Sequence, residues 1–343
     1  MKHDDRFFKY VRNFLTVYLP KNRCVSENTV KAYRDTINLL RVFMEEKEAI
    51  AFAKITFDRF DHIIIGRFLD WLESQRECSV STRNHRLAAL KSFFKYAAQE
   101  DPSLMMTYVE LGRVPVKRTP SPTITYLSEK ALSTLLQQPP ESTRRGIRDR
   151  FIMIFLYDTG ARIQELLDLK LKDLHLNDSV PCVYLTGKGH KMRAIPLLKK
   201  TVKHLDLYMK YYHPPETRNN DDLLFYTVIK GNIGKMSADN VASFLKRYGT
   251  SARVDCLEVP DRVYPHLFRH TRAMHLYQMG MPLSYIKDFL GHASVNTTNI
   301  YASADVSMLK VALEKANARN DVPRELPAWQ KHEELLLHLC GLK

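Results

Sequence analysis

The chain has 343 residues, of which 45% are hydrophobic and 26% charged, and it carries a formal net charge of +14 at pH 7. Length and composition are those of a globular protein of two domains, rich in helix-forming residues. The charge favours a polyanionic partner, and we prefer nucleic acid to a basic surface that is merely solvated.

Several other classes of protein are disfavoured. No uncharged apolar stretch approaches the length of a membrane-spanning helix, and the charged first residues lack the apolar run of a signal peptide. The cysteines are dispersed without a C-x-x-C pair, which argues against a disulfide framework and a zinc site. We therefore expect a cytoplasmic protein in a reducing compartment, without a membrane partner.

Helical periodicity dominates the N-terminal third of the chain. Apolar residues recur at spacings of three and four over 27–46, 60–74 and 79–100, which predicts three amphipathic helices. Ser81 or Thr82 is placed to cap the third helix. Basic residues lie largely off its apolar stripe, so this helix is expected to present a cationic face.

A basic, proline-containing segment follows at 112–125. It has three prolines and a glycine, lacks helical periodicity, and carries Arg113, Lys117 and Arg118. It is predicted to link two domains, either as a plain solvated connector or as a strap that tracks DNA.

The rest of the chain combines helices with a few short β segments. Helices are expected over 129–138, 145–160, 162–169, 238–248, 265–280, 282–290, 295–301 and 305–318. The helix that begins at 238 is expected to stop at Gly249. Strands are expected over 172–178, 181–186 and 192–197, with a hairpin turn at 187–191. The fold class is therefore mainly α with a small antiparallel sheet.

The stretch YPHLFRHTRAMH concentrates ionisable groups on one predicted helix. With Pro265 at the first helical position, His266 and Arg269 share a face beside the positive end of the helix dipole. This arrangement favours a bound phosphate. His270 is spaced to form a metal pair with His266, but the arginines would repel a cation, so we prefer a buried, hydrogen-bonded histidine.

Two further patterns carry residues suited to phosphate chemistry. In YDTGARIQELLDL, Arg162 begins a helix behind a glycine turn, and Glu165 lies one turn later. In LGHASVNTTNIY, His292 follows a glycine, and Tyr301 comes nine residues later. Each pattern is weak by itself, because glycine before histidine is common at helix ends and a helical tyrosine is usually a core residue.

Taken together, these patterns resemble the tyrosine recombinases, the family of phage integrases and Xer-type recombinases. The resemblance rests on Arg162, Lys188 in GKGHKMRAIPL, HLFRH at 266–270, GH at 291–292 and Tyr301, in that order. It covers about residues 157–302 and is looser for the N-terminal helices. Every catalytic position of the family is filled.

The family's architecture implies a C-shaped, two-domain DNA clamp with the tyrosine-recombinase catalytic fold. A helical, SAM-like core-binding domain would span 1–111 and a basic linker 112–125. The catalytic domain would span 126–318. A tail helix at 319–343 would pack on a neighbouring protomer or on its own domain, with Trp329, Leu336 and Leu339 as anchors.

The resemblance also implies roles at the site. Tyr301 would attack a backbone phosphodiester and form a 3′-phosphotyrosyl link, while Arg162 and Arg269 would hold the non-bridging oxygens of the transition state. His266 would accept or position the tyrosine proton, and His292 would add a hydrogen bond to the phosphate.

The remaining roles are those of an acid and of supporting groups. Lys188 at the hairpin tip would protonate the leaving 5′ oxygen, with Lys191 and Arg193 as rival donors. Glu165 and His270 would support the residues that touch the phosphate. No cofactor and no metal ion are expected.

The implied partner is double-stranded DNA at core or attachment sites, bound by a homo-tetramer. An accessory directionality protein is a further implied partner, and the nucleoid is the implied location. Candidate DNA-contact residues, each weighed against a solvated face, are Arg83, Asn84, Arg86, Lys91, Lys117, Arg118, Lys246 and Arg247.

The predicted function is thus site-specific DNA recombination, as the integrase or transposase of a mobile element or as a Xer-type resolver. Two alternatives stay open on the sequence. A type IB topoisomerase or telomere resolvase would share the chemistry, and a non-catalytic relative would share only the DNA binding.

Overall fold

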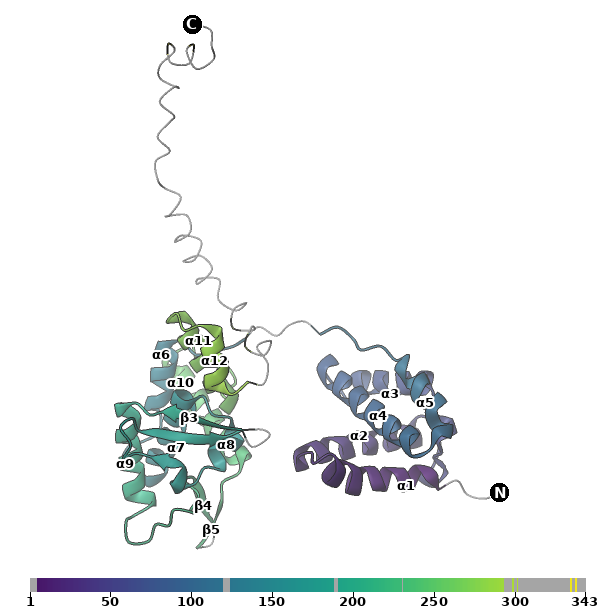
Figure 1. Ribbon diagram of the computed structural model, residues 1–343, viewed down its shortest axis with the longest axis horizontal. Coiled ribbons are helices and arrows are strands. Elements are labelled where there is room, and N and C mark those ends of the chain that lie inside the picture. Colours follow the sequence, from purple (N-terminus) through teal and green to yellow (C-terminus); the bar gives the residue numbers. More distant parts are fainter. Residues whose placement is uncertain are drawn as a thin grey trace. The chain divides into compact units, whose positions relative to one another are not determined.

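A computed structural model describes residues 5–119, 124–187, 191–229 and 231–292, together with residues 298, 301, 334 and 337. By its contacts the chain divides into two compact units, 1–122 and 123–343. Figure 1 shows that the first unit is helical and that the second combines helices with short strands. The predicted fold class, mainly α with small antiparallel sheets, is confirmed.

The first unit is built on an aromatic core. Its helices are α1 (Arg6–Asn13), a π-helical continuation (Phe14–Asn22), α2 (Glu27–Glu46), α3 (His62–Ser74), α4 (Val80–Glu100) and α5 (Met105–Gly112). Phe14, Phe57 and Phe93 are fully buried in this core. Ser79, rather than Ser81 or Thr82, caps α4, because its hydroxyl accepts the Thr82 N–H at 3.2 Å.

The second unit is organised around α7. Its helices are α6 (Glu129–Gln137), α7 (Arg144–Thr159), α8 (Ile163–Leu167), α9 (Lys199–Tyr212), α10 (Ala238–Asp255), α11 (Pro265–Gln278) and α12 (Leu283–Leu290). The apolar helix α7 packs against both α9 and α11 (Figure 1). Gly160 ends it in the left-handed conformation, with φ at +58°.

Two small antiparallel sheets complete the second unit. One contains β1 (Leu174–His175), β2 (Cys182–Thr186) and β3 (Met192–Pro196), and the predicted β2–β3 hairpin is confirmed. The other is a hairpin of β4 (Tyr226–Ile229) and β5 (Asn232–Lys235), which the periodicity did not predict.

One helix boundary was predicted wrongly. The helix α10 passes through Gly249 and continues to Asp255. A Cβ atom at Gly249 would lie 2.6 Å from the Val263 side chain, so this glycine allows close packing and does not end the helix. The predicted helices at 295–301 and 305–318, apart from residues 298 and 301, and the tail anchors Trp329, Leu336 and Leu339 lie outside the described residues.

Candidate active site

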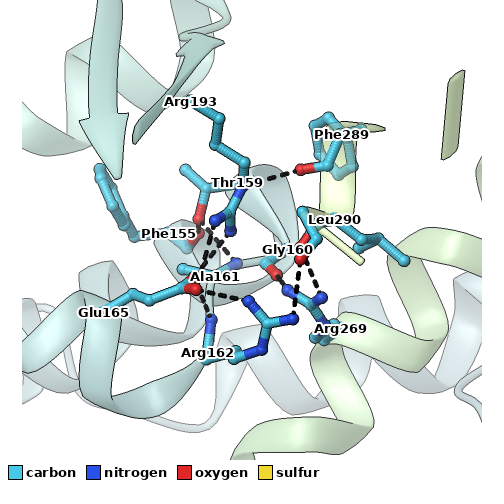
Figure 2. A network of polar contacts seen from close by, with 11 residues as sticks. Phe155, Thr159, Gly160, Ala161, Arg162, Glu165, Arg193, Arg269, Phe289 and Leu290 are labelled. Carbon is cyan, nitrogen blue, oxygen red and sulfur yellow. Dashed lines mark hydrogen bonds and ion pairs between the residues drawn. The ribbon is translucent and has the colours of Figure 1, made fainter. Parts of the chain in front are cut away.

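The site begins at the turn between α7 and α8. Thr159 is fully buried; its hydroxyl donates to the Phe155 carbonyl at 2.6 Å and accepts the Ala161 N–H at 3.2 Å. This bonding fixes the chain on both sides of Gly160, so that Arg162 follows at the start of α8 (Figure 2). The buried Thr159 thus fixes the backbone that positions Arg162.

Glu165 connects two arginines from distant parts of the chain. Its Oε1 accepts from Arg162 Nη1 at 2.6 Å, and its Oε2 accepts from Arg193 Nη2 at 2.7 Å (Figure 2). Arg193 lies on β3 and also donates from Nε to the Phe289 carbonyl at 3.0 Å. One buried carboxylate therefore joins α8, β3 and the end of α12.

The charge of Glu165 is held by these partners. Burial alone would raise the pKa of its carboxyl, but the hydrogen bonds from Arg193 and Arg162 and the charge of Arg193 outweigh burial and hold that pKa below its usual value. Glu165 is therefore ionised at neutral pH, although only 7% of the residue is exposed.

Arg269 is the most enclosed cation of the site. It lies on α11, is 3% exposed, and donates to the Gly160 carbonyl at 2.6 Å and to the Leu290 carbonyl at 2.5 Å (Figure 2). Arg162 donates to the next carbonyl, that of Gly291, at 3.0 Å. Burial and the charge of Arg162 lower the pKa of Arg269 to about 9. Two guanidinium groups thus converge on the adjoining ends of α7 and α12.

Three histidines and Tyr301 surround this pair. His266 is exposed on the first turn of α11, whereas the Tyr301 hydroxyl, which is buried, lies 3.1 Å from Nδ1 of His270. Nδ1 of His292 lies 2.9 Å from the Thr298 hydroxyl. Burial and the neighbouring cationic and histidine groups lower the pKa of His270 and of His292 to about 4, so both rings are neutral at pH 7.

Of the predicted catalytic residues, those that the structure describes lie together at this site. Lys188 lies outside the described residues, but its neighbour Gly187 packs against Glu165: a Cβ atom there would lie 3.2 Å from Oε1. Within the described residues, no three histidine, cysteine or acidic side chains are grouped to hold a metal ion.

Arg193 is the site residue whose place the sequence analysis missed. The sequence predicts only a rival proton donor at this position, whereas the Arg193 side chain is 12% exposed and engaged by Glu165. A signal was present. In the predicted strand 192–197, Arg193 is two residues from the apolar Ile195 and so shares its face, and an inward-facing arginine requires a buried acceptor.

The candidate DNA-contact residues of α4 need a correction. Arg83 is 3% exposed and donates to the Pro115 carbonyl at 3.0 Å, so it does not present a surface to DNA. Asn84 pairs with both backbone polar groups of Lys117, and Lys91 donates to the Val114 carbonyl at 3.0 Å. These side chains hold the start of the predicted linker on α4, because its backbone groups need partners there.

Among the described helices, none combines the length and the apolar character needed to cross a bilayer.

Comparison with known proteins agrees with this geometry. Residues 125–308 match the model of the phage integrase family, and residues 13–101 match that of the phage integrase N-terminal SAM-like domain. The chain belongs to the phage integrase family. Its prediction as a tyrosine-type site-specific DNA recombinase is confirmed by relatives of that name.

Two relatives illustrate the match. The Sinorhizobium fredii protein y4rC, provisionally named an integrase/recombinase, is 33% identical over 309 residues, which cover 90% of each chain. Tyrosine recombinase XerC of Staphylococcus epidermidis is 28% identical over 301 residues, which cover 88% of this chain and 95% of XerC.

Solved structures share the fold. The XerH recombinase bound to a palindromic difH substrate has a TM-score of 0.64 at 22% identity, and the match covers 91% of this chain and 89% of XerH. The Tn1549 transposon integrase bound to transposon right-end DNA also has a TM-score of 0.64, at 20% identity, and the match covers 88% of this chain and 98% of the integrase.

Glu165→Gln tests the role of the shared carboxylate. We expect the free energy of unfolding at pH 7 to fall by about 1–3 kcal/mol, because two arginines lose a charged acceptor. The pKa of Glu165 is lower in the folded than in the unfolded chain, so the ionised carboxylate stabilises the fold at pH values above its pKa in the unfolded chain. The difference in the free energy of unfolding between wild type and Glu165→Gln should therefore shrink as the pH falls below about 4. Urea unfolding at pH 7 and pH 3.5 measures it.

Glu141→Gln is the matched control, because Glu141 pairs with Arg150 but its side chain is 74% exposed. Its expected loss is at most about 1 kcal/mol. An equal loss for Glu165→Gln at both pH values would show that the charge of Glu165 contributes nothing.

Proposed function

We propose that this recombinase cleaves and rejoins DNA through a 3′-phosphotyrosyl intermediate formed at Tyr301. The observation that carries the proposal is the meeting of Arg162, Arg269 and Tyr301 around the adjoining ends of α7, α11 and α12. Two guanidinium groups match the non-bridging oxygens of a phosphate and stay charged at neutral pH.

The other roles follow from position. His292, next to Gly291, donates a further hydrogen bond to the phosphate, and Lys188, which lies between β2 and β3 in the sequence, acts as the acid for the leaving 5′ oxygen. The exposed His266 is free to meet the phosphate at the start of α11. Glu165 orients Arg162 and Arg193.

For the DNA contacts of the second unit, we favour Arg247 over Lys246. The two cations line different cavities. Arg247 shares a cavity of about 580 Å³ with Arg144, Arg145 and Arg148 and with no acidic residue. The cavity beside Lys246 has a lining of mixed charge, with Arg253 and Arg262 beside Glu258 and Asp261.

In the first unit, Arg86 donates to the Ala32 carbonyl and Lys117 pairs with Glu73, whereas Arg118 is exposed. We therefore retain Arg118 as the candidate contact of the linker. The clamp around duplex DNA, the domain boundaries, the tetramer and docking of the tail on a neighbour remain predictions.

The biological role that we propose is recombination of a mobile element in the nucleoid of the cell, with an accessory directionality protein as an optional partner. The integrase/recombinase name of the Sinorhizobium fredii relative supports this role. Chromosome dimer resolution is the second candidate, supported by the similarity to XerC.

Covalent trapping tests the proposal. A DNA site that the protein binds is first selected from a random pool. The protein is then incubated with this site carrying a nick near the cleavage position, so that the short leaving strand diffuses away after cleavage. We expect a denaturant-resistant protein–DNA adduct whose modified peptide contains Tyr301. Failure of the wild type to form the adduct on the selected DNA would overturn the proposal, and relaxation of arbitrary supercoiled plasmid would point to a topoisomerase.

A further inference from the structure

The nucleophile proposed above is paired with a histidine that the sequence analysis treated as support. The Tyr301 hydroxyl lies 3.1 Å from Nδ1 of His270, and Tyr301 is 1% exposed, so water does not compete for this contact. No described contact joins Tyr301 to His266. His266 is exposed one turn earlier on α11, and its ring centre lies 6.5 Å from that of His270.

The two histidines of α11 therefore have different surroundings. His266, at the first turn, has access to a ligand at the helix start, whereas His270 faces the ring of Tyr301, with centres 5.9 Å apart. Arg269 lies between them in sequence and acts electrostatically on both histidines and on Tyr301. Among the described residues, the hydrogen-bond partner of the Tyr301 hydroxyl is thus His270.

The protonation state of His270 suits an acceptor. Burial, His266 and Arg269 lower its pKa to about 4, and among the residues that the structure describes the other titratable groups facing it are Tyr301 and His292. A neutral ring that accepts at Nδ1 carries its own proton on Nε2. A bound phosphate would offset the field of Arg269, and it would thereby raise the basicity of His270 when substrate is present.

We propose that His270 is the catalytic residue that accepts the Tyr301 proton during DNA cleavage. This proposal rests on the proposed function. The Tyr301 O–H bond breaks and its proton moves to Nδ1 of His270, while the tyrosine oxygen bonds to phosphorus. The P–O5′ bond breaks, and the 5′ oxygen leaves with a proton from the acid that we assign to Lys188. Rejoining reverses each transfer.

His270→Asn separates acceptance of a proton from simple positioning. The asparagine oxygen falls near the place of Nδ1 and still accepts a hydrogen bond, but it is not a base. Single-turnover cleavage is followed from pH 6 to pH 9 on the selected site carrying a 5′-bridging sulfur, which leaves without an acid. We expect a rate about 10²–10³-fold below wild type at pH 7, rising close to tenfold per pH unit as hydroxide ionises the tyrosine.

His275→Asn is the matched control, because His275 lies on the same helix and its Nδ1 lies 2.8 Å from the hydroxyl of another tyrosine, Tyr157. It should keep the pH profile of the wild type, whatever its effect on stability. His266→Asn tests the rival base and should also keep that profile.

The outcomes are distinct. A wild-type-like rate and profile in His270→Asn, or the steep profile in His266→Asn instead, would overturn the assignment and leave the proposed function intact. Absence of any adduct in the wild type would remove the proposed function itself. If His270→Asn does not fold, His270→Ala with added imidazole replaces it: a rate that rises with neutral imidazole supports the assignment, and an independent rate overturns it.

Discussion

Tyr301→Phe is expected to lower the rate of covalent attachment to DNA by at least about 10⁴-fold, while DNA affinity stays within a factor of about two of the wild-type value. The phenyl ring keeps the buried packing of Tyr301 against α11 and α12, and only the attacking oxygen is lost. Losing the hydrogen bond with His270 costs at most about 1.5 kcal/mol of stability. Denaturing gels report the adduct, and gel shifts report binding.

The matched control is Tyr277→Phe, because Tyr277 packs against the same apolar cluster. It should form the adduct at the wild-type rate. If Tyr301→Phe still becomes attached to DNA, another side chain is the nucleophile, and the assignment of Tyr301 is wrong.

Arg269→Lys is expected to reduce the rate of cleavage about 10²–10³-fold. The guanidinium reaches two carbonyls, those of Gly160 and Leu290, and has further N–H groups for a phosphate oxygen. A lysine ammonium is a single point of charge and cannot span these acceptors. The buried carbonyls left without a donor should also lower the free energy of unfolding, by about 1–3 kcal/mol each.

Single-turnover cleavage on the selected DNA site measures the rate, and urea unfolding measures the loss of stability. Arg253→Lys is the control, because Arg253 also donates to a carbonyl, that of Val259, at 2.9 Å. Equal losses in both variants would contradict the prediction.

Local patterns were sufficient for many elements of the fold. The helix over 27–46 has the predicted bounds, and α11 begins at Pro265, because periodicity, capping groups and a proline at the first turn act within a few residues. Gly160 and Gly291 end their helices with positive φ for the same reason. Gly249 did not follow this rule, since its neighbour Val263 is distant in sequence and closeness to it cannot be seen locally.

By itself, the sequence determined the family and the set of candidate catalytic residues, because their order and spacing are carried by the chain. Tertiary structure alone decided which partner each of these polar side chains meets. Arg83 is buried against the linker, Arg193 is held by Glu165, and His270 rather than His266 meets Tyr301. The physical reason is that a charged or polar group in the interior must find a partner, and which partner it finds depends on contacts between segments far apart along the chain.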